Sequence, residues 1–323
     1  MCTAITFRTK DHYFGRNLDF EHDFGQAVVV TPRNYPFRFR KAEAMESHYA
    51  IIGMAVADNG YPLYFDGTNE KGLSMAGLYF PGNAVYLPEK AGMINIAPFE
   101  FIPWILGSCE NISQVRNKLK YINIADITYS EQFPSTPLHW IVADQENSLV
   151  AEPTADGLKV YENPVGVLTN NPPFDFHLHN LTRYLNLTRE EPTNRFAPNY
   201  PLTPYSRGMG AIGLPGDLSS SSRFVRAAFV KLNSVCDVSD SASISQFFHI
   251  LSSVAQQEGC AKVGNAFEKT IYTSCCNTSR GDYYYTTYEN SQITGISLYN
   301  TDLESSKLTV FPLINKPQIR MEN

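Results

Sequence analysis

The sequence lacks any apolar run near the ~18 residues that a membrane-spanning helix needs, and no secretory-type apolar segment follows its first residues. Basic residues are also in the minority, because 26 lysines and arginines stand against 32 acidic residues and are dispersed along the chain. A nucleic-acid-binding protein normally presents a basic patch, and a membrane-surface protein a basic amphipathic helix. We therefore expect a cytoplasmic protein with neither nucleic acid nor membrane as partner.

Metal-binding and redox motifs are absent as well. The six cysteines form no Cys-x-x-Cys pair, so a zinc ribbon or a thioredoxin-like site has no support. Cys275 and Cys276 are adjacent in a strand-like segment, where neighbouring side chains face opposite ways, and we expect two packed thiols. His177 and His179 have no third ligand nearby. His139 is compatible with a Cys–His pair and with a packed strand histidine.

The segment 208–213 reads Gly-x-Gly-x-x-Gly, the fingerprint of dinucleotide sites. Prolines precede and follow it, whereas the motif works only between a strand and a helix. It lies in the Pro-, Asn- and Gly-rich stretch 172–217, which predicts a long irregular excursion with room for one helix. We therefore expect no nucleotide cofactor and no metal.

The chain is rich in tyrosine (19) and phenylalanine (20), and such composition favours sheet. Alternating and apolar segments predict strands at 2–8, 13–19, 28–30, 51–57, 61–65, 72–79, 138–142, 149–152, 158–161, 167–170, 270–274, 282–288, 295–298 and 308–311. Helices are predicted at 98–106, 113–121, 221–233 and 244–256, the last capped by Ser243. This order does not alternate strand and helix. It predicts an α+β fold with antiparallel sheets and segregated helices, in one domain over 1–323.

The main chemical signal is Cys2, which follows the initiator methionine. Removal of Met1 would leave a thiol and an α-amino group on one carbon. A free terminal amine has a pKa of ~7.7–8.0 and can act as a base near neutral pH, and such an amine can activate the nucleophile of its own residue. A cysteine at this position is also compatible with an ordinary residue in a frayed terminus.

A hairpin of 2–8 with 13–19 would bring further groups to Cys2. If the turn is tight about Lys10 and Asp11, Cys2 lies opposite Asp19, with Cβ atoms roughly 5 Å apart. A carboxylate would then lie beside the terminal amine. Arg16 would face the other way in a regular strand, unless a bulge at Gly15 redirects it.

Over essentially its whole length the sequence resembles the choloylglycine hydrolases, a family that includes bile salt hydrolases and penicillin V acylases. The segments that carry the resemblance are 1–6, 13–19, 69–73, 98–104, 137–140, 167–172, 214–217 and 222–224. The family belongs to the N-terminal nucleophile hydrolases. The resemblance implies a four-layer αββα sandwich, with two antiparallel sheets between helical layers, and a cytoplasmic homotetramer.

The resemblance also implies a role for each residue that matches a family motif. The implied catalytic residues are Cys2 as nucleophile after loss of Met1, Arg16 beside the thiol, Asp19 holding the amine, Asn170 and the Tyr79 backbone N–H as oxyanion donors, and Arg223 as anchor of the charge network. From the residues alone, Arg16 is also compatible with a surface arginine, Asp19 with a turn or cap, and Asn170 with a turn before a proline.

The implied reaction is hydrolysis of the amide that joins a bile acid to glycine or taurine, through a thioester and without metal or cofactor. Phe24, Phe65 and Phe133 lie in loop-like segments and are candidates to contact the steroid, although each is also compatible with the core. Ser206-Arg207-Gly208 resembles a loop associated with glycine-conjugate preference.

Tyr79 departs from the bile-salt pattern, because asparagine is typical there, whereas some penicillin V acylases have tyrosine. Penicillin V is therefore an alternative substrate. A non-catalytic ligand-binding homologue is a third interpretation.

Overall fold

The computed structural model describes residues 1–323 and contains two large antiparallel sheets. The first sheet consists of β1 (Cys2–Arg8), β2 (His12–Phe20), β12 (Val167–Leu168), β13 (Ala261–Val263), β14 (Ala266–Asn277), β15 (Asp282–Thr287) and β16 (Thr294–Ser297). Its order is β12-β1-β2-β14-β15-β16, with β13 paired to β14.

The second sheet consists of β3 (Ala27–Thr31), β4 (Ile51–Asp58), β5 (Tyr61–Asn69), β6 (Ser74–Tyr79), β9 (Leu138–Ala143), β10 (Ser148–Thr154), β11 (Gly157–Glu162) and β17 (Thr309–Pro312). Its order is β11-β10-β9-β6-β5-β4-β3-β17. A separate parallel pair joins β7 (Ile94–Ile96) to β8 (Ile122–Ile124).

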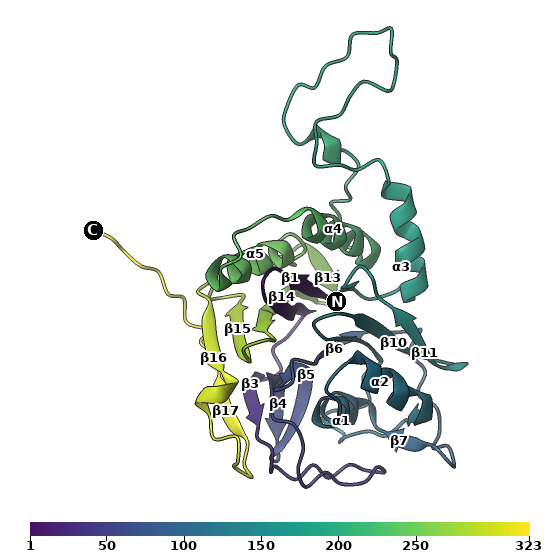
Figure 1. The fold of residues 1–323 in the computed structure, drawn as a ribbon, viewed down its shortest axis with the longest axis vertical. Coiled ribbons are helices and arrows are strands. Elements are labelled where there is room, and N and C mark those ends of the chain that lie inside the picture. Colours follow the sequence, from purple (N-terminus) through teal and green to yellow (C-terminus); the bar gives the residue numbers. More distant parts are fainter.

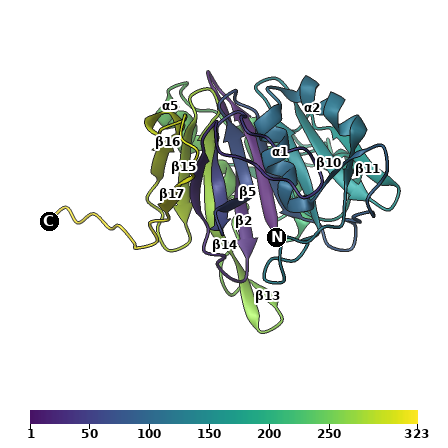
Figure 2. The ribbon, with the colours of Figure 1, turned by 90° about the horizontal axis from the view of Figure 1, so that it is seen from below.

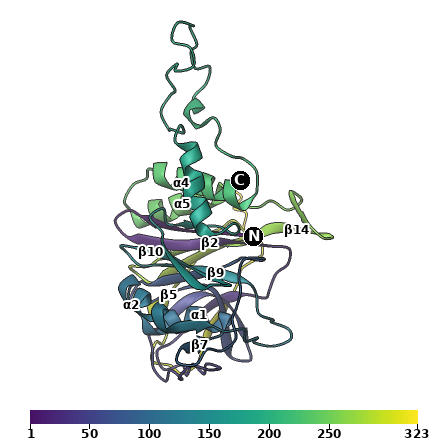
Figure 3. The ribbon, with the colours of Figure 1, turned by 90° about the vertical axis from the view of Figure 1, so that its right-hand side faces the viewer.

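The two sheets stack face to face with helices outside them (Figure 3). α4 (Ser220–Asn233) and α5 (Asp240–Ser252) cover the first sheet, and α1 (Phe101–Ser108) and α2 (Ile112–Lys118) lie on the second (Figures 1 and 3). One hydrophobic cluster fills the space between the sheets and beneath α4 and α5, and another lies between the second sheet and α1 and α2. The predicted α+β class and the αββα layers are confirmed.

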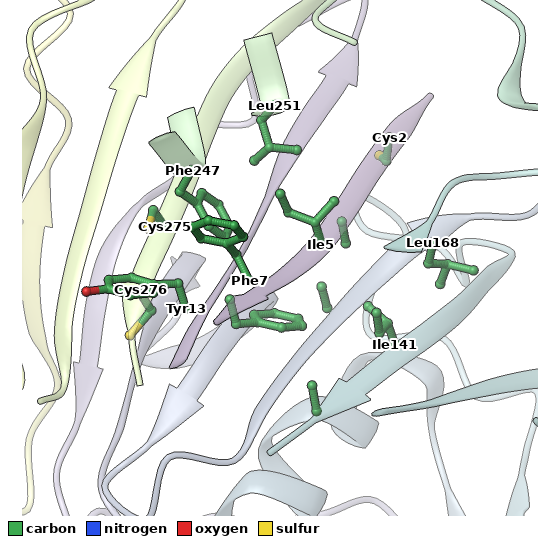
Figure 4. Packing of buried hydrophobic residues seen from close by; sticks show 14 of the residues in the cluster. Cys2, Ile5, Phe7, Tyr13, Ile141, Leu168, Phe247, Leu251, Cys275 and Cys276 are labelled. Atoms are coloured by element: carbon green, nitrogen blue, oxygen red, sulfur yellow. The ribbon is translucent and has the colours of Figure 1, made fainter. Parts of the chain in front are cut away.

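β1 is buried on both sides, and of its seven residues only Thr6 and Arg8 are not buried. Ile5 and Phe7 lie on the side of β1 that faces Phe247 and Leu251 of α5 (Figure 4). Cys2 and Ala4 have the opposite parity and face the second sheet, because side chains alternate along a strand. Each large apolar side chain buried in this way contributes about 1.5–3 kcal/mol. The strand that carries Cys2 is thus fixed at the centre of the molecule.

A 3₁₀ turn at Pro98–Glu100 precedes α1, and the starts of α5 and α2 also differ from the sequence-based prediction. α5 begins at Asp240 after the N-cap Ser239, not at Ser243, which is buried within the helix and hydrogen-bonds Thr9. α2 begins after Asn111, whose side chain accepts a hydrogen bond from the backbone N–H of Gln114 at 3.0 Å. In both cases an earlier polar residue supplies the capping position.

The excursion at 185–212 projects from the body beyond α3 (Phe174–Asn180) and contains only one short 3₁₀ turn (Figure 1). The C-terminal segment and the β13–β14 hairpin also extend outward (Figure 2). None of the helices combines the length and the apolar character that crossing a bilayer requires.

Candidate active site

The β1–β2 hairpin differs by one residue from the predicted register. Cys2 pairs with Leu18, not with Asp19, and Arg8 pairs with His12. The turn therefore contains three residues, closed by a hydrogen bond from the Thr9 N–H to the Asp11 carbonyl at 3.0 Å. The prediction assumed a two-residue turn, so it is corrected here.

The corrected register changes which side chains share a face. Arg16 and Leu18 now lie on the same side as Cys2, so no bulge at Gly15 is needed to redirect Arg16. Asp19 faces the opposite side, toward α4. Its backbone still reaches the chain terminus, because the Asp19 carbonyl accepts a hydrogen bond from the Met1 amino group at 2.7 Å.

A β-bulge in β14 also places residues close in sequence on opposite faces of the first sheet. The register between β2 and β14 shifts between Thr270, which pairs with Asp19, and Tyr272, which pairs with Leu18. Thr270 donates a hydrogen bond to Asp19 Oδ1 at 2.6 Å on the helix side. Tyr272 donates to Asp66 Oδ2 of the second sheet at 2.6 Å. The bulge lets one strand support groups on both faces of the sheet.

Cys2 lies at one wall of a cavity of about 590 Å³ that is lined mainly by apolar side chains. The predicted residues Arg16, Phe24, Phe65, Tyr79 and Phe133 all line the same cavity. Its other lining residues are Leu18, Phe20, His22, Asp23, Val56, Leu63, Tyr64, Gly77, Pro98, Phe99, Ile102, Tyr129, Gln132, Pro134, Ser135, Thr136, Leu138 and Trp140. The structure thus places a thiol at the wall of an apolar chamber formed by both sheets.

Arg16 is fully buried and fixed by backbone carbonyls of the second sheet. Its Nη1 donates to Gly77 O at 2.5 Å and to Phe65 O at 3.2 Å. Its Nη2 has no partner. Burial disfavours the charge, but Cys2, Tyr272 and Asp66 together raise the pKa of Arg16, so it stays a cation. A free donor on a fixed cation is thus available beside Cys2.

Asn170 is held at several points at the end of β12. Its Oδ1 accepts hydrogen bonds from the Cys2 backbone N–H at 2.7 Å and from Arg223 Nη2 at 2.8 Å. Its Nδ2 donates to the Tyr79 carbonyl at 2.6 Å. An amide nitrogen carries two N–H donors, so one of them remains for a ligand.

Arg223 projects from the first turn of α4 and joins the N-terminal residues to Asn170. Its Nη1 donates to Cys2 O at 2.5 Å and to Thr3 Oγ1 at 2.6 Å, and lies 3.9 Å from Asp19 Oδ2. Burial lowers the pKa of Arg223, and burial raises the pKa of Asp19 despite the nearby guanidinium. Because both groups are enclosed, each is the other's main charge partner.

The remaining sequence candidates lie outside this constellation. The His139 ring lies 2.9 Å from Glu152 Oε1 and 2.8 Å from Thr169 O and stacks on Phe80, so it is a packed strand histidine. Cys275 and Cys276 are buried free thiols in β14, as predicted.

The structure also adds residues that sequence reasoning missed, namely Thr270, Tyr272, Asp66 and Glu268. Glu268 contacts the Met1 amino group. Thr270 hydrogen-bonds Asp19, and Tyr272 hydrogen-bonds Asp66. None of these residues belongs to a recognisable motif. Thr270 and Tyr272 reach opposite faces of the sheet because a bulge lies between them.

Chemically, the site combines a thiol, a fixed cation, amide donors and a chain terminus whose next residue is the thiol itself. Once the preceding residue is removed, the nitrogen held by Asn170 becomes a primary amine. Such an arrangement can attack a carbonyl carbon and move a proton to and from the departing group.

Known proteins resemble this chain over nearly its full length. The model of the linear amide C–N hydrolases, choloylglycine hydrolase family, matches residues 2–311. A bile salt hydrolase/transferase of Lactiplantibacillus plantarum is 51% identical over 319 residues, covering 98% of each chain. One of Clostridium perfringens is 39% identical and covers 96% of each chain.

Solved structures agree. A conjugated bile acid hydrolase of Clostridium perfringens superposes with a TM-score of 0.91 at 36% identity and covers 100% of both chains. A penicillin V acylase of Agrobacterium tumefaciens shares the fold, with a TM-score of 0.76 at 19% identity, covering 96% of this chain and 91% of that one.

Proposed function

Because the chain belongs to the linear amide C–N hydrolases of the choloylglycine hydrolase family, we propose that it hydrolyses the amide bond of bile acids conjugated to glycine or taurine. The relatives that resemble it over nearly their full length are bile salt hydrolases. The observation that carries the proposal is the Cys2 thiol at the wall of a largely apolar cavity of about 590 Å³, within the ~300–1,000 Å³ typical of small-molecule sites.

In the proposed acylation step, Met1 has been removed and the Cys2 thiolate attacks the amide carbonyl. Arg16, whose Nη2 is unpaired, stabilises the thiolate. The second N–H of Asn170 Nδ2 and the Tyr79 backbone N–H bind the oxyanion, and such a donor is worth about 2.7–4 kcal/mol in the transition state. The α-amine then protonates the departing glycine or taurine.

In the proposed deacylation step, water attacks the thioester with the same amine as base. Asn170 Oδ1 holds this nitrogen at 2.7 Å. Arg223 fixes Asn170 and the Cys2 carbonyl, and Asp19 lies beside Arg223 as its charge partner. An amine that enters in place of water would give acyl transfer, the second activity in the names of the two relatives.

We assign the steroid to the apolar part of the cavity. Phe24 and Phe65 contact one another with ring centroids 5.4 Å apart, and Phe133 lies 6.2 Å from Tyr129. Aromatic walls of this kind bury a large apolar surface, at about 25 cal/mol per Å². All three phenylalanines line the cavity that contains Cys2.

The assay that tests the function compares glycocholate, taurocholate and penicillin V, with Cys2→Ala as the inactive control. Intact-mass analysis establishes whether Met1 is absent from the purified protein. Hydrolysis of the two bile salts by Met1-free protein is expected. A protein that retains Met1 and cleaves none of the three amides would instead be a non-catalytic homologue.

Penicillin V acylase activity is the second candidate, and Tyr79 favours it. This side chain lines the cavity and contacts Phe20 edge-on, with centroids 6.5 Å apart. We expect Tyr79→Asn to raise the ratio of bile salt to penicillin V hydrolysis, with Tyr79→Phe as the matched control that removes only the hydroxyl. If the ratio does not change in Tyr79→Asn, Tyr79 does not set substrate preference.

For the assembly, we propose a cytoplasmic homotetramer. The excursion at 185–212 exposes Leu185, Phe196 and Tyr205, with Phe196 92% and Tyr205 86% accessible. Large exposed apolar side chains gathered on one projecting segment are typical of protein–protein contacts.

A further inference from the structure

Glu268 is a buried carboxylate to which the proposed mechanism gives no role. It lies on β14, is 4% exposed, and its Oε1 accepts no hydrogen bond. Its one ionic contact is with the amino group of Met1. A buried carboxylate without a donor or a cation is disfavoured in its charged form, so a positive partner stabilises the charge at this position.

The β14 bulge explains why Glu268 points toward the chain terminus. Glu268 lies two residues before Thr270 and therefore shares its face. Thr270 pairs with Asp19 on that face. The Asp19 carbonyl in turn accepts from the Met1 amino group at 2.7 Å. Two carboxylate-bearing residues from two strands thus adjoin the start of the chain.

The Met1 amino group stands one residue ahead of the amine that the proposed reaction uses. Removal of Met1 takes away the cation that Glu268 contacts and creates an α-ammonium on Cys2. One N–H of this ammonium is directed to Asn170 Oδ1, which the Cys2 nitrogen already contacts at 2.7 Å. The other two N–H groups would point into the space that Met1 has left, where Asp19 and Glu268 lie.

We propose that Glu268 is a positioning residue that holds the α-ammonium of Cys2 in the processed enzyme, directly or through one water molecule. The inference rests on the proposed hydrolase function and deepens it. It makes Glu268 the second acidic residue, with Asp19, beside this ammonium.

The charges that face this amine come from four elements. Asp19 and Arg16 lie on β2, Arg223 on α4, Glu268 on β14, and the Cys2 thiol on β1 itself. Burial lowers the pKa of the Met1 amino group, Cys2 and Asp19 raise it, and Arg223 and Arg16 lower it again. Asp66 adds a carboxylate beside Arg16, whereas Asp19 and Glu268 are the two acidic residues that adjoin the chain terminus.

The test compares Glu268→Gln and Glu268→Leu, which both remove the charge, with Glu268→Asp, which keeps it. Glu258→Gln is the matched control, because Glu258 is exposed and pairs with Lys269. Intact mass confirms loss of Met1 in each variant, and kcat/KM for glycocholate is measured against pH. We expect the alkaline limb of the neutral variants to move down by about one pH unit, because acylation needs the protonated α-amine and loss of a nearby opposite charge makes this amine easier to deprotonate.

A second measurement does not need catalysis. In a Cys2→Ala background, labelling of the N-terminal amine by acetic anhydride is followed against pH by peptide mapping. We expect the labelling midpoint to fall by about one pH unit in Glu268→Gln and to stay unchanged in Glu268→Asp. A midpoint that is the same in Glu268→Gln overturns the inference, even if the protein melts at a lower temperature. If the unmodified enzyme hydrolyses no bile salt, the proposed function fails, whereas the labelling comparison still decides the role of Glu268.

Discussion

At the residue scale, Asn170 connects three of the proposed catalytic residues. It contacts the Cys2 nitrogen and Arg223 through Oδ1 and the Tyr79 carbonyl through Nδ2. Asn171 is its matched neighbour, because its Nδ2 donates to the Pro81 carbonyl at 2.6 Å and contacts none of the proposed catalytic groups.

We expect Asn170→Ala to lower kcat/KM for glycocholate by about 10²–10³-fold, the loss typical of one oxyanion donor. Asn171→Ala should retain activity within a few fold. The measurement is steady-state kinetics on Met1-free protein of both variants. Equal losses in the two variants would show that Asn170 acts through general packing.

His12 gives a stability prediction at the same scale. The side chain is buried, and burial lowers its pKa to about 4, with Asp144 raising it and Arg8 and Lys231 lowering it further. Its folded pKa is therefore below its unfolded value. The stabilisation is fully present above pH ~6.5 and is lost as the pH falls toward 4, because the unfolded chain then binds a proton that the folded chain refuses.

We expect the unmodified protein to lose about 2 kcal/mol more than His12→Gln in its free energy of unfolding when the pH falls from 7 to 5. Glutamine can still hydrogen-bond Thr278, which lies 2.9 Å from His12 Nδ1. Urea unfolding at the two pH values measures the difference. Parallel losses in the two proteins would remove His12 as the cause.

At the element scale, the close pairing of β2 with β14 positions Arg16. A Cβ on Gly15 would lie 2.0 Å from the Ser274 carbonyl oxygen of β14, which is backbone and cannot move aside. We expect Gly15→Ala to destabilise the fold by about 1–3 kcal/mol, the usual cost of overpacking. Arg16 is the next residue, so activity should fall as well.

Gly216→Ala is the control for this change, because nothing lies within 4 Å of an added Cβ at Gly216. Thermal melting of the two variants against the unmodified protein measures the effect. If both variants melt together, the approach of β2 to β14 is less restrictive than the structure indicates.

The elements also show how far sequence reasoning reaches. Strands such as β1 and β6 were predicted because apolar alternation and length are local signals. The register of the β1–β2 hairpin was missed by one residue, since pairing depends on whether the turn holds two residues or three. The bulge before Tyr272 leaves no local pattern, so nothing in the sequence indicated which face of β14 meets Asp19.

The residues of the candidate site were likewise predictable only in part. Cys2 could be selected from its position next to Met1, and the resemblance to a family supplied the roles of Arg16 and Asn170. Glu268 could not be selected, because its relation to the chain terminus arises only when β14 is placed beside β2. Long-range pairing of this kind is set by the packing of the whole sheet.

At the scale of the whole molecule, the excursion at 185–212 projects from the body and exposes large apolar side chains (Figure 1). We expect Phe196→Asp combined with Tyr205→Asp to lower the molar mass measured by light scattering during size-exclusion chromatography. Charge on side chains that are exposed in one subunit and buried between subunits opposes association.

Tyr121→Asp is the control, because Tyr121 is 64% exposed but lies outside the excursion. A double variant with the same mass as the control would place the subunit contacts elsewhere. Retention of hydrolysis in a smaller species would show that one chain suffices for the reaction.

The burial of β1 has a practical consequence for handling the protein. Affinity tags and fusion partners on the amino end would extend a strand whose start is enclosed by two carboxylates and two arginines, and they would convert the proposed catalytic amine into an amide. The opposite end runs outward from the body (Figure 2). Purification handles, fluorophores and attachment to a solid support therefore belong on the carboxyl end.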